Sequence, residues 1–282
     1  MSLPGSPPRP VPLGRRSALL LALVSLAGLM IFFWPLLIPV NPASQGHATD
    51  SPFIFIIILP VLVAIVLAQL SEGGMDSKAL AMLGVLSALN AALRPLGAGV
   101  NGIETVFFLL ILAGWVFGPG FGFVLGCTSM FASALLTAGV GPWLPFQMLT
   151  SAWIGMLAGL LPHSIRGRQI TGRKEIALLA AFGVVAAYLF GFLMNMWFWP
   201  FVTGAAMGDG SGLAYIPGAP ILENLHRFIV FTVITSSLGW DTGRAITNAA
   251  AIVLLGPSVL LLLRRAVRRA NFTAEVRFTT PA

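Results

Sequence analysis

The residues of this chain that could take part in chemistry are polar and ionisable side chains beside long apolar stretches. An ionisable group in membrane hydrocarbon costs at least about 2.5–3.5 kcal/mol, so such residues usually serve a function. Here nearly all of them fall at one end of the apolar stretches once the charge pattern orients the chain. Charged, amide and aromatic side chains that converge in this way bind small polar molecules. The residues that we predict to do so are Arg94, Asn101, Glu104, Trp143, Gln147, Asn195, Trp199, His226, Trp240 and Asp241.

Part of this set has a simpler interpretation. The tryptophans are also typical of the aromatic belts at membrane interfaces. Asp241 and Arg244, three residues apart, are also compatible with an ordinary ion pair at the start of a helix. Taken together with Arg94 and Glu104, however, they favour a functional cavity, because burying four charged side chains is costly.

Enzymatic motifs do not occur in the sequence. There is no Walker loop, no His-Glu-x-x-His, no Gly-x-Ser-x-Gly and no paired cysteine set. The single cysteine, Cys127, excludes a disulfide framework, and His226 has no His or carboxylate three or four residues later to share a metal. The glycine-rich residues 118–122 lack the Lys-Ser/Thr ending of a phosphate loop and are interpreted as a turn. We therefore expect no catalytic residue, no metal and no cofactor.

The elements that must position the polar residues are membrane-spanning helices. Of the 282 residues, 57% are hydrophobic and 9% are charged, whereas soluble domains carry about 25% charged residues. About 20 apolar residues are needed to cross a bilayer as a helix. Eight stretches approach or reach this length, at residues 18–40, 53–70, 79–96, 103–118, 120–139, 144–161, 176–200 and 245–263.

The orientation of these spans follows from three clusters of Lys and Arg, in residues 9–16, 166–174 and 264–269. Short cytoplasmic loops are enriched in such residues, and eight spans place all three clusters and both termini in the cytoplasm. The apolar segment 228–238 is about half a span long. If it crossed, the last cluster would lie outside, so we interpret it as a short outer half helix. The net charge of +7 therefore reflects topology and not nucleic-acid binding.

The chain divides into four predicted parts. Residues 1–16, rich in proline, form a disordered cytoplasmic tail. Residues 17–72 hold two additional N-terminal transmembrane helices, since the apolar run 18–40 is too long for a signal peptide. Residues 79–269 contain the other six spans, and residues 270–282 are a cytoplasmic tail. The predicted fold is an all-α integral membrane protein: a six-helix bundle, two additional N-terminal transmembrane helices and a short outer half helix.

Small residues recur at every fourth position in several predicted spans. Such ladders let helix backbones approach closely in lipid. Packing within the bundle is the more common use, and docking of a partner subunit is the alternative. Trp115 is a bulky exception inside the second ladder. The ladders are Gly84, Ala88 and Ala92; Gly114, Gly118, Gly122 and Gly126; and Gly155 and Gly159.

Residues 79–269 resemble the substrate-binding S components of energy-coupling factor (ECF) transporters. The resemblance is carried by residues 113–123 (AGWVFGPGFGF), 139–148 (GVGPWLPFQM), 155–161, 191–195 (GFLMN) and 240–265. The string 141–148 is most similar to the S components assigned to cobalamin and its precursors. The first two spans are an addition to the six helices of that family.

This resemblance implies a function. S components capture a vitamin-like micronutrient near the outer face of the cell membrane and have no enzymatic activity. They work with a membrane-embedded coupling subunit and two cytoplasmic ATPase subunits. The ladder Gly84, Ala88 and Ala92 is most like the residues by which S components meet the coupling subunit. A corrinoid would suit an aromatic-lined outer cavity, but the residue spacing is equally compatible with flavin, pyrimidine and biotin-like ligands.

Two other functions remain open on the sequence. A secondary transporter would be expected to show inverted repeats and charged residues near the bilayer midplane, and neither is evident. A membrane-embedded structural or assembly subunit that binds no solute is harder to exclude.

Overall fold

The structure of the chain is a computed structural model that describes residues 11, 13–33, 36, 75, 77–97, 102–141, 143–199, 212–216 and 218–270. Four predictions lie outside these residues: the second span at 53–70, most of the N-terminal tail, nearly all of the C-terminal tail, and the candidate residue Asn101.

Helices occupy every predicted span that falls within the described residues. Between α7 and α8, an antiparallel ribbon with two residues in each strand pairs β1 (Ser164–Ile165) with β2 (Arg168–Gln169). The helices are α1 (Arg15–Phe32), α4 (Ser77–Leu93), α5 (Val106–Phe117), α6 (Pro119–Leu136), α7 (Leu144–Leu160), α8 (Arg173–Phe198), α10 (Ile221–Thr232) and α11 (Thr242–Ala270), and a 3-10 turn, Arg94–Gly97, follows α4.

Among the described helices, four are long and apolar enough to cross a membrane: Arg15–Phe32, Pro119–Leu136, Arg173–Trp197 and Ile221–Arg269. Three shorter apolar helices, α4, α5 and α7, pack beside them. The arrangement is that of a multi-pass all-α membrane protein.

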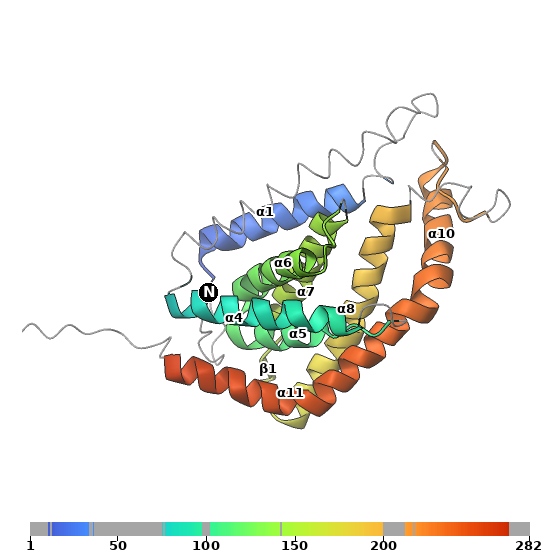
Figure 1. Ribbon diagram of the computed structural model, residues 1–282. Helices are drawn as coiled ribbons and strands as arrows, with labels where there is room; N and C mark the ends of the chain where they lie inside the picture. The colour runs from blue at the N-terminus through green and yellow to red at the C-terminus, as the bar shows by residue number, and fades with distance from the viewer. Residues whose placement is uncertain are drawn as a thin grey trace, which may run out of the picture.

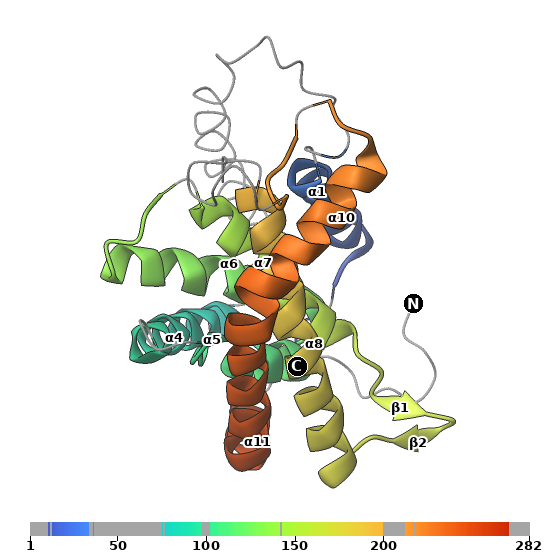
Figure 2. The ribbon, with the colours of Figure 1, turned by 90° about the vertical axis from the view of Figure 1, so that its right-hand side faces the viewer.

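The predicted half helix is not a separate element, which corrects the sequence interpretation. Residues 221–269 form one continuous helical run of 49 residues, in which a π-helical segment, Val233–Asp241 (η3), joins α10 to α11. Its contour is roughly 70 Å, more than twice the thickness of the hydrocarbon core. Figures 1 and 2 both show α10 at an angle to α11. The π segment keeps the backbone hydrogen-bonded through residues where hydropathy alone suggests a break.

The core of the bundle is the seam between α5, α6 and α7. Eleven of the twelve residues of α5 are buried. A Cβ added to Gly114 or to Gly122 would collide with the carbonyl oxygen of Gly155. A Cβ on Gly126 would lie 2.5 Å from the Ala152 backbone. The second and third ladders therefore pack inside the bundle, as the more common interpretation predicted.

The first ladder behaves differently. Gly84, Ala88 and Ala92 are all exposed on α4, and a Cβ on Gly84 would meet nothing within 4 Å. This ladder is not used for packing among the described helices.

The additional helix α1 is attached to the bundle through α7. Trp153 Nε1 donates a hydrogen bond to Ser25 Oγ (2.9 Å), and Gly28 lies against Leu149 and Trp153. Phe32 is fully buried, with its ring 5.0 Å from that of Phe146. The remaining surface of α1 is largely exposed.

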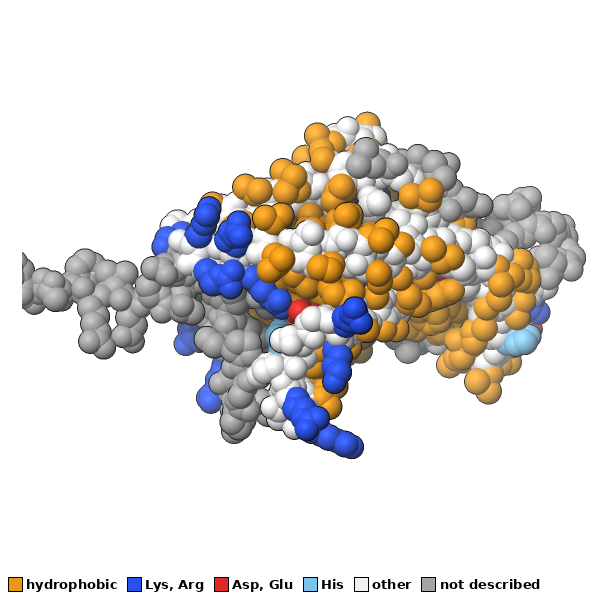
Figure 3. All heavy atoms as spheres, turned by 90° about the horizontal axis from the view of Figure 1, so that it is seen from below, with side chains coloured by type: hydrophobic (Ala, Val, Ile, Leu, Met, Phe, Trp, Pro, Cys, Tyr) orange, Lys and Arg blue, Asp and Glu red, His pale blue; other side chains and the backbone are white. Residues whose placement is uncertain are grey.

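One end of the bundle is basic, and it is called the basic end below. Arg15, Arg173 and Arg264 mark it at the starts of α1 and α8 and near the end of α11. Most Lys and Arg side chains in Figure 3 lie in the left half of the face, and hydrophobic side chains cover much of the remainder.

The basic end also holds a buried polar cluster, although no candidate residue was predicted there. Trp115 Nε1 donates to Glu175 Oε1 (2.5 Å), and Arg264 pairs with the same carboxylate. The Trp115 ring stacks on His163 with 3.8 Å between centroids. Trp115 thus links α5 to α8, α11 and the turn after α7, which accounts for a bulky residue among glycines.

Candidate functional site

The loop between α4 and α5 brings Glu104 to the start of α11. Thr105 Oγ1 donates to the Leu93 carbonyl (2.8 Å) and holds the loop against the end of α4. Gly102 has φ +73°, and a Cβ there would lie 2.7 Å from the Trp240 carbonyl and 2.8 Å from Gly243 Cα. Only glycine combines this backbone angle with so close an approach.

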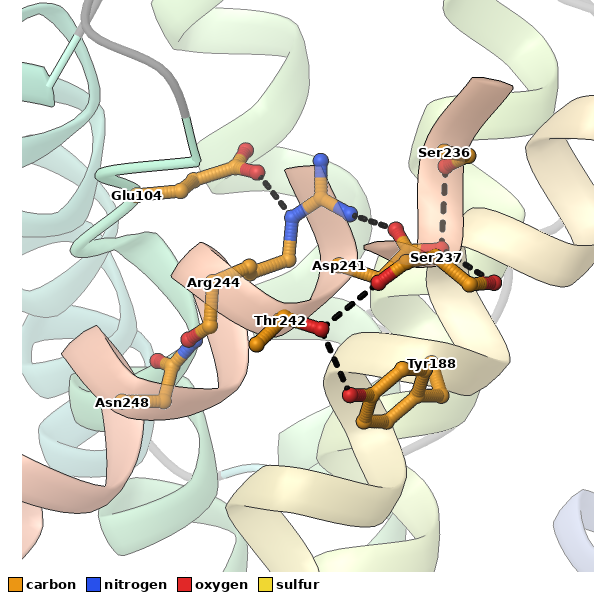
Figure 4. A network of polar contacts seen from close by, with 8 residues as sticks. All are labelled: Glu104, Tyr188, Ser236, Ser237, Asp241, Thr242, Arg244 and Asn248. Atoms are coloured by element: carbon orange, nitrogen blue, oxygen red, sulfur yellow. Dashed lines mark hydrogen bonds and ion pairs between the residues drawn. The ribbon is translucent and has the colours of Figure 1, made fainter. Parts of the chain in front are cut away.

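Arg244 lies between two carboxylates (Figure 4). Its Nε donates to Glu104 Oε2 (2.5 Å), and its Nη1 donates to Asp241 Oδ1 (2.7 Å). The guanidinium also lies 4.9 Å from the centroid of the Phe190 ring on α8. Arg244 of α11 therefore connects the loop before α5, helix α8 and the π segment.

The π segment orients Asp241 by placing two serine hydroxyl groups within hydrogen-bond distance of its carboxylate. In a π-helix, residues five apart lie next to each other. Ser236 Oγ donates to Asp241 Oδ2 (2.9 Å), and Ser237 Oγ is 3.3 Å from the same oxygen. Thr242 Oγ1 donates to the Ser237 carbonyl (2.6 Å) and is 2.8 Å from the Tyr188 hydroxyl of α8.

Asp241 packs directly on the backbone of α8. A Cβ on Gly191 would collide with both carboxylate oxygens of Asp241. The absence of a side chain at this one position of α8 therefore makes room for the carboxylate.

The resulting ion network is strongly desolvated. Asp241 is fully buried, and the side chain of Arg244 is 12% exposed. Removing one partner of such a pair leaves an uncompensated charge and typically costs about 3–5 kcal/mol. Two carboxylates around one guanidinium leave a formal charge of −1. Arg94, which Glu104 attracts electrostatically, supplies the balancing charge nearby.

Arg94 forms a second contact at the same end of the bundle. Its Nη2 donates to Gln147 Oε1 (2.9 Å) and joins the end of α4 to the first turn of α7. The structure thus brings four of the predicted residues into contacts at this end of the bundle: Arg94 bonds to Gln147, and Glu104 and Asp241 both pair with Arg244.

Three buried polar atoms near the ion network have no hydrogen-bond partner among the described residues. Asn248 Oδ1 is one turn beyond Arg244, toward the basic end, and the other two are Asn195 Nδ2 on α8 and Thr232 Oγ1 on α10. Asn195 is one helical turn beyond Gly191, and Thr232 is one turn before Ser236. Because Gly191 and Ser236 both contact Asp241, the last two unpaired atoms lie on the same side of it, away from the basic end.

The remaining candidates do not join this group. Trp143, His226 and Trp240 are exposed at the surface. Trp199 is buried in a separate cluster with Met196, Phe228 and Phe231, where its Nε1 donates to the Leu213 carbonyl (2.7 Å).

Sequence reasoning missed Ser236, Ser237, Thr242 and Tyr188. Hydroxyl residues are common in membrane helices, so their type carried little information. Their spacing would be informative only if the π winding were known, because 236 and 241 are not neighbours on an α-helix.

Comparison with known families gives one clear result. A family model described as ECF transporter, substrate-specific component, matches residues 78–239. The chain belongs to this family. No curated protein and no solved structure matched it.

This S component is therefore the substrate-specific subunit of an ECF importer, and S components as a family are transport subunits. The match begins at the start of α4 and ends inside the π segment. It includes Glu104, Gln147, Asn195 and Ser236, whereas Asp241 and Arg244 follow directly after it. Helix α1 lies outside it.

Proposed function

We propose that this S component captures a vitamin-like solute at the end of the bundle that holds Glu104, Asp241 and Arg244. In this proposal the basic end faces the cytoplasm, in keeping with the enrichment of Lys and Arg in cytoplasmic loops. Arg264 follows Arg244 by 20 residues on α11, or about 30 Å along a helix, which matches the thickness of the hydrocarbon core. The ion network then lies at the outer side of the membrane.

The observation that carries the proposal is the pair of unpaired atoms beside the buried ion network. Buried polar groups are normally hydrogen-bonded, and each one left unsatisfied costs about 1–3 kcal/mol. A solute that accepts from Asn195 Nδ2 and bonds to Thr232 Oγ1 would satisfy both groups. The ion network of Glu104, Asp241 and Arg244, about one helical turn nearer the basic end, would hold the two groups in place.

Transport requires a partner that supplies energy. ECF S components work with a membrane-embedded coupling subunit and cytoplasmic ATPases, and here we propose two ATPase subunits. The exposed ladder Gly84, Ala88 and Ala92 on α4 is the surface that fits the coupling subunit. Small residues without packing partners let another helix approach closely.

Corrinoids are the first solutes to test, because residues 141–148 are most similar to the cobalamin type. The aromatic residues that would line a wide cavity are dispersed, with Trp143 and Trp240 exposed and Trp199 in its own cluster. The polar residues therefore support solute capture, and the choice of corrinoid rests on the resemblance of that string alone.

The first experiment identifies the solute and tests its site. The purified protein is analysed by mass spectrometry for a co-purified small molecule, and cyanocobalamin, riboflavin and biotin are titrated. Thr232→Val removes the unpaired hydroxyl and is expected to weaken binding about tenfold, the worth of one good hydrogen bond. Thr235→Val is the matched control, because its hydroxyl already donates to the Phe231 carbonyl (2.8 Å).

Asn195→Leu should weaken binding in the same way as Thr232→Val. Equal affinity in both variants and the unaltered protein would contradict the proposed site. Failure to find any bound small molecule would instead favour a structural or assembly subunit.

A second experiment tests the coupling surface. Ala88→Leu adds bulk to the exposed ladder and should abolish co-purification with the coupling subunit, while solute binding is retained. Ala250→Leu makes the same change at an exposed position of α11 and should leave the complex intact. Co-purification of the Ala88→Leu variant at the normal level would exclude this surface.

A further inference from the structure

A second group of buried polar side chains lies on α4, α6 and α7, nearer the basic end than the Arg94–Gln147 bond or level with it. This polar junction consists of Asn90, Ser133, Thr150 and Ser151, each 0–1% exposed. Asn90 Oδ1 and the hydroxyl oxygens of the three others have no hydrogen-bond partner within the described part of the chain.

Three hydrogen bonds establish how these helices are aligned. Ser87 Oγ is 2.7 Å from Thr128 Oγ1, and Asn90 Nδ2 donates to Ser129 Oγ (3.0 Å), so α4 and α6 run in the same direction. One turn further along α4, Arg94 bonds to Gln147 of α7.

The alignment of α6 with α7 completes the junction. Gly122 contacts Gly155, and Gly126 contacts Ala152, so α7 runs antiparallel to α6 and hence to α4. Thr150 and Ser151 follow Gln147 by three and four residues, on the same helical face and one turn nearer the basic end. Asn90 precedes Arg94 by one turn, which places it at the level of Thr150 and Ser151. Ser133 follows Ser129 by one turn on α6.

Unpaired polar atoms from three helices thus occupy two successive turns of the bundle. Asn90, Thr150 and Ser151 share one level, and Ser133 lies one turn farther from the basic end, at the level of Arg94. Several unsatisfied groups at a helix junction are unfavourable in lipid, because no bulk water is available to bond them. The usual explanation of such groups in a native structure is a bound molecule that completes their hydrogen bonds.

We propose that the polar junction binds a small uncharged group that both donates and accepts hydrogen bonds. None of the four side chains is ionisable, and an ion would need a counter-charge that they do not supply. Two sources offer this chemistry: ordered water and a hydroxyl or amide end of the transported solute. Only the second source rests on the proposed function.

Thermal unfolding separates an occupied junction from an empty one. If the junction is empty, Thr150→Val and Ser151→Ala remove unsatisfied groups and should raise the melting temperature or leave it unchanged. If it is occupied, each variant should lower the melting temperature by about 2–4 °C. Thr137→Val is the control, since its exposed hydroxyl already donates to the Ser133 carbonyl (2.8 Å).

Cysteine labelling provides a test that does not depend on stability. Thiols react as thiolates, which require a hydrated environment. Ser133→Cys is made with Cys127→Ala and treated with methyl methanethiosulfonate. The chain with its natural Cys127, equally buried on α6, is the control. We expect labelling of position 133 to be at least tenfold faster.

The labelling experiment also distinguishes the two sources. Protection of position 133 by saturating cyanocobalamin, riboflavin or biotin, whichever binds, identifies the solute as the occupant. Labelling that is unchanged by the bound vitamin identifies water. Labelling as slow as that of Cys127, together with a melting temperature that does not fall in Thr150→Val, would overturn the proposal. The labelling rate and the melting temperature can be measured even if the protein binds no vitamin. The proposal for the polar junction and the proposed function can therefore fail independently.

Discussion

The carboxylate of Asp241 lies directly on the backbone of Gly191, in the space that a side chain on α8 would fill. This contact positions the π segment on α8 and thereby orients Arg244 toward Glu104. A glycine on one helix and an aspartate on another are therefore parts of the same site.

Gly191→Ala should displace Asp241 and disturb the whole network. Overpacking of this kind costs about 1–3 kcal/mol, so we expect a lower melting temperature and weaker solute binding. Gly84→Ala, where the added Cβ meets nothing within 4 Å, is the control for stability and should not lower the melting temperature. Unchanged stability and binding in Gly191→Ala would show that Asp241 is not held in this position.

Arg244→Gln should be far more damaging than Arg227→Gln. The first leaves Asp241 buried without its cation, at a cost of about 3–5 kcal/mol. The second breaks the Arg227–Glu223 pair, in which Glu223 is 46% exposed, and should cost about 0–1 kcal/mol. Thermal unfolding in the same detergent compares them, and similar losses would contradict the burial of the network.

Glu175→Gln should destabilise the basic end. Glutamine still accepts a hydrogen bond from Trp115, but it no longer neutralises Arg264, so we expect a loss of about 1–3 kcal/mol. Lys174→Gln changes the exposed neighbouring residue and should alter the stability by no more than about 0.5 kcal/mol. Equal melting temperatures in Glu175→Gln and Lys174→Gln would show that the cluster contributes nothing to stability.

Phe32→Ala should loosen the attachment of α1. Truncating a buried phenylalanine costs about 3–5 kcal/mol in soluble cores, and we expect the lower part of that range because lipid replaces water outside the bundle. Met30→Ala, at a 59% exposed position of the same helix, is the control. Limited proteolysis near residue 33, together with the melting temperature, measures the effect, and equal protection in both variants would refute the anchoring role of Phe32.

The sequence by itself determined that this is a multi-span membrane protein, where most of its helices lie, and that the chain resembles the S components. These features depend on composition, on the length of apolar runs and on local charge, all of which can be read along the chain. The internal use of Gly114, Gly122 and Gly155 was also predicted, since packing within the bundle is the more common use of such ladders.

The tertiary structure alone decided which polar residues meet. Asp241 reaches Ser236 only because the intervening residues wind as a π-helix, and Glu104 reaches Arg244 only because Gly102 permits close contact between two segments 140 residues apart. Glu175 was overlooked for the same reason: a charge near a span boundary looks solvated until packing shows it buried. Such pairings depend on distances between helices, which hydropathy and spacing along one helix do not specify.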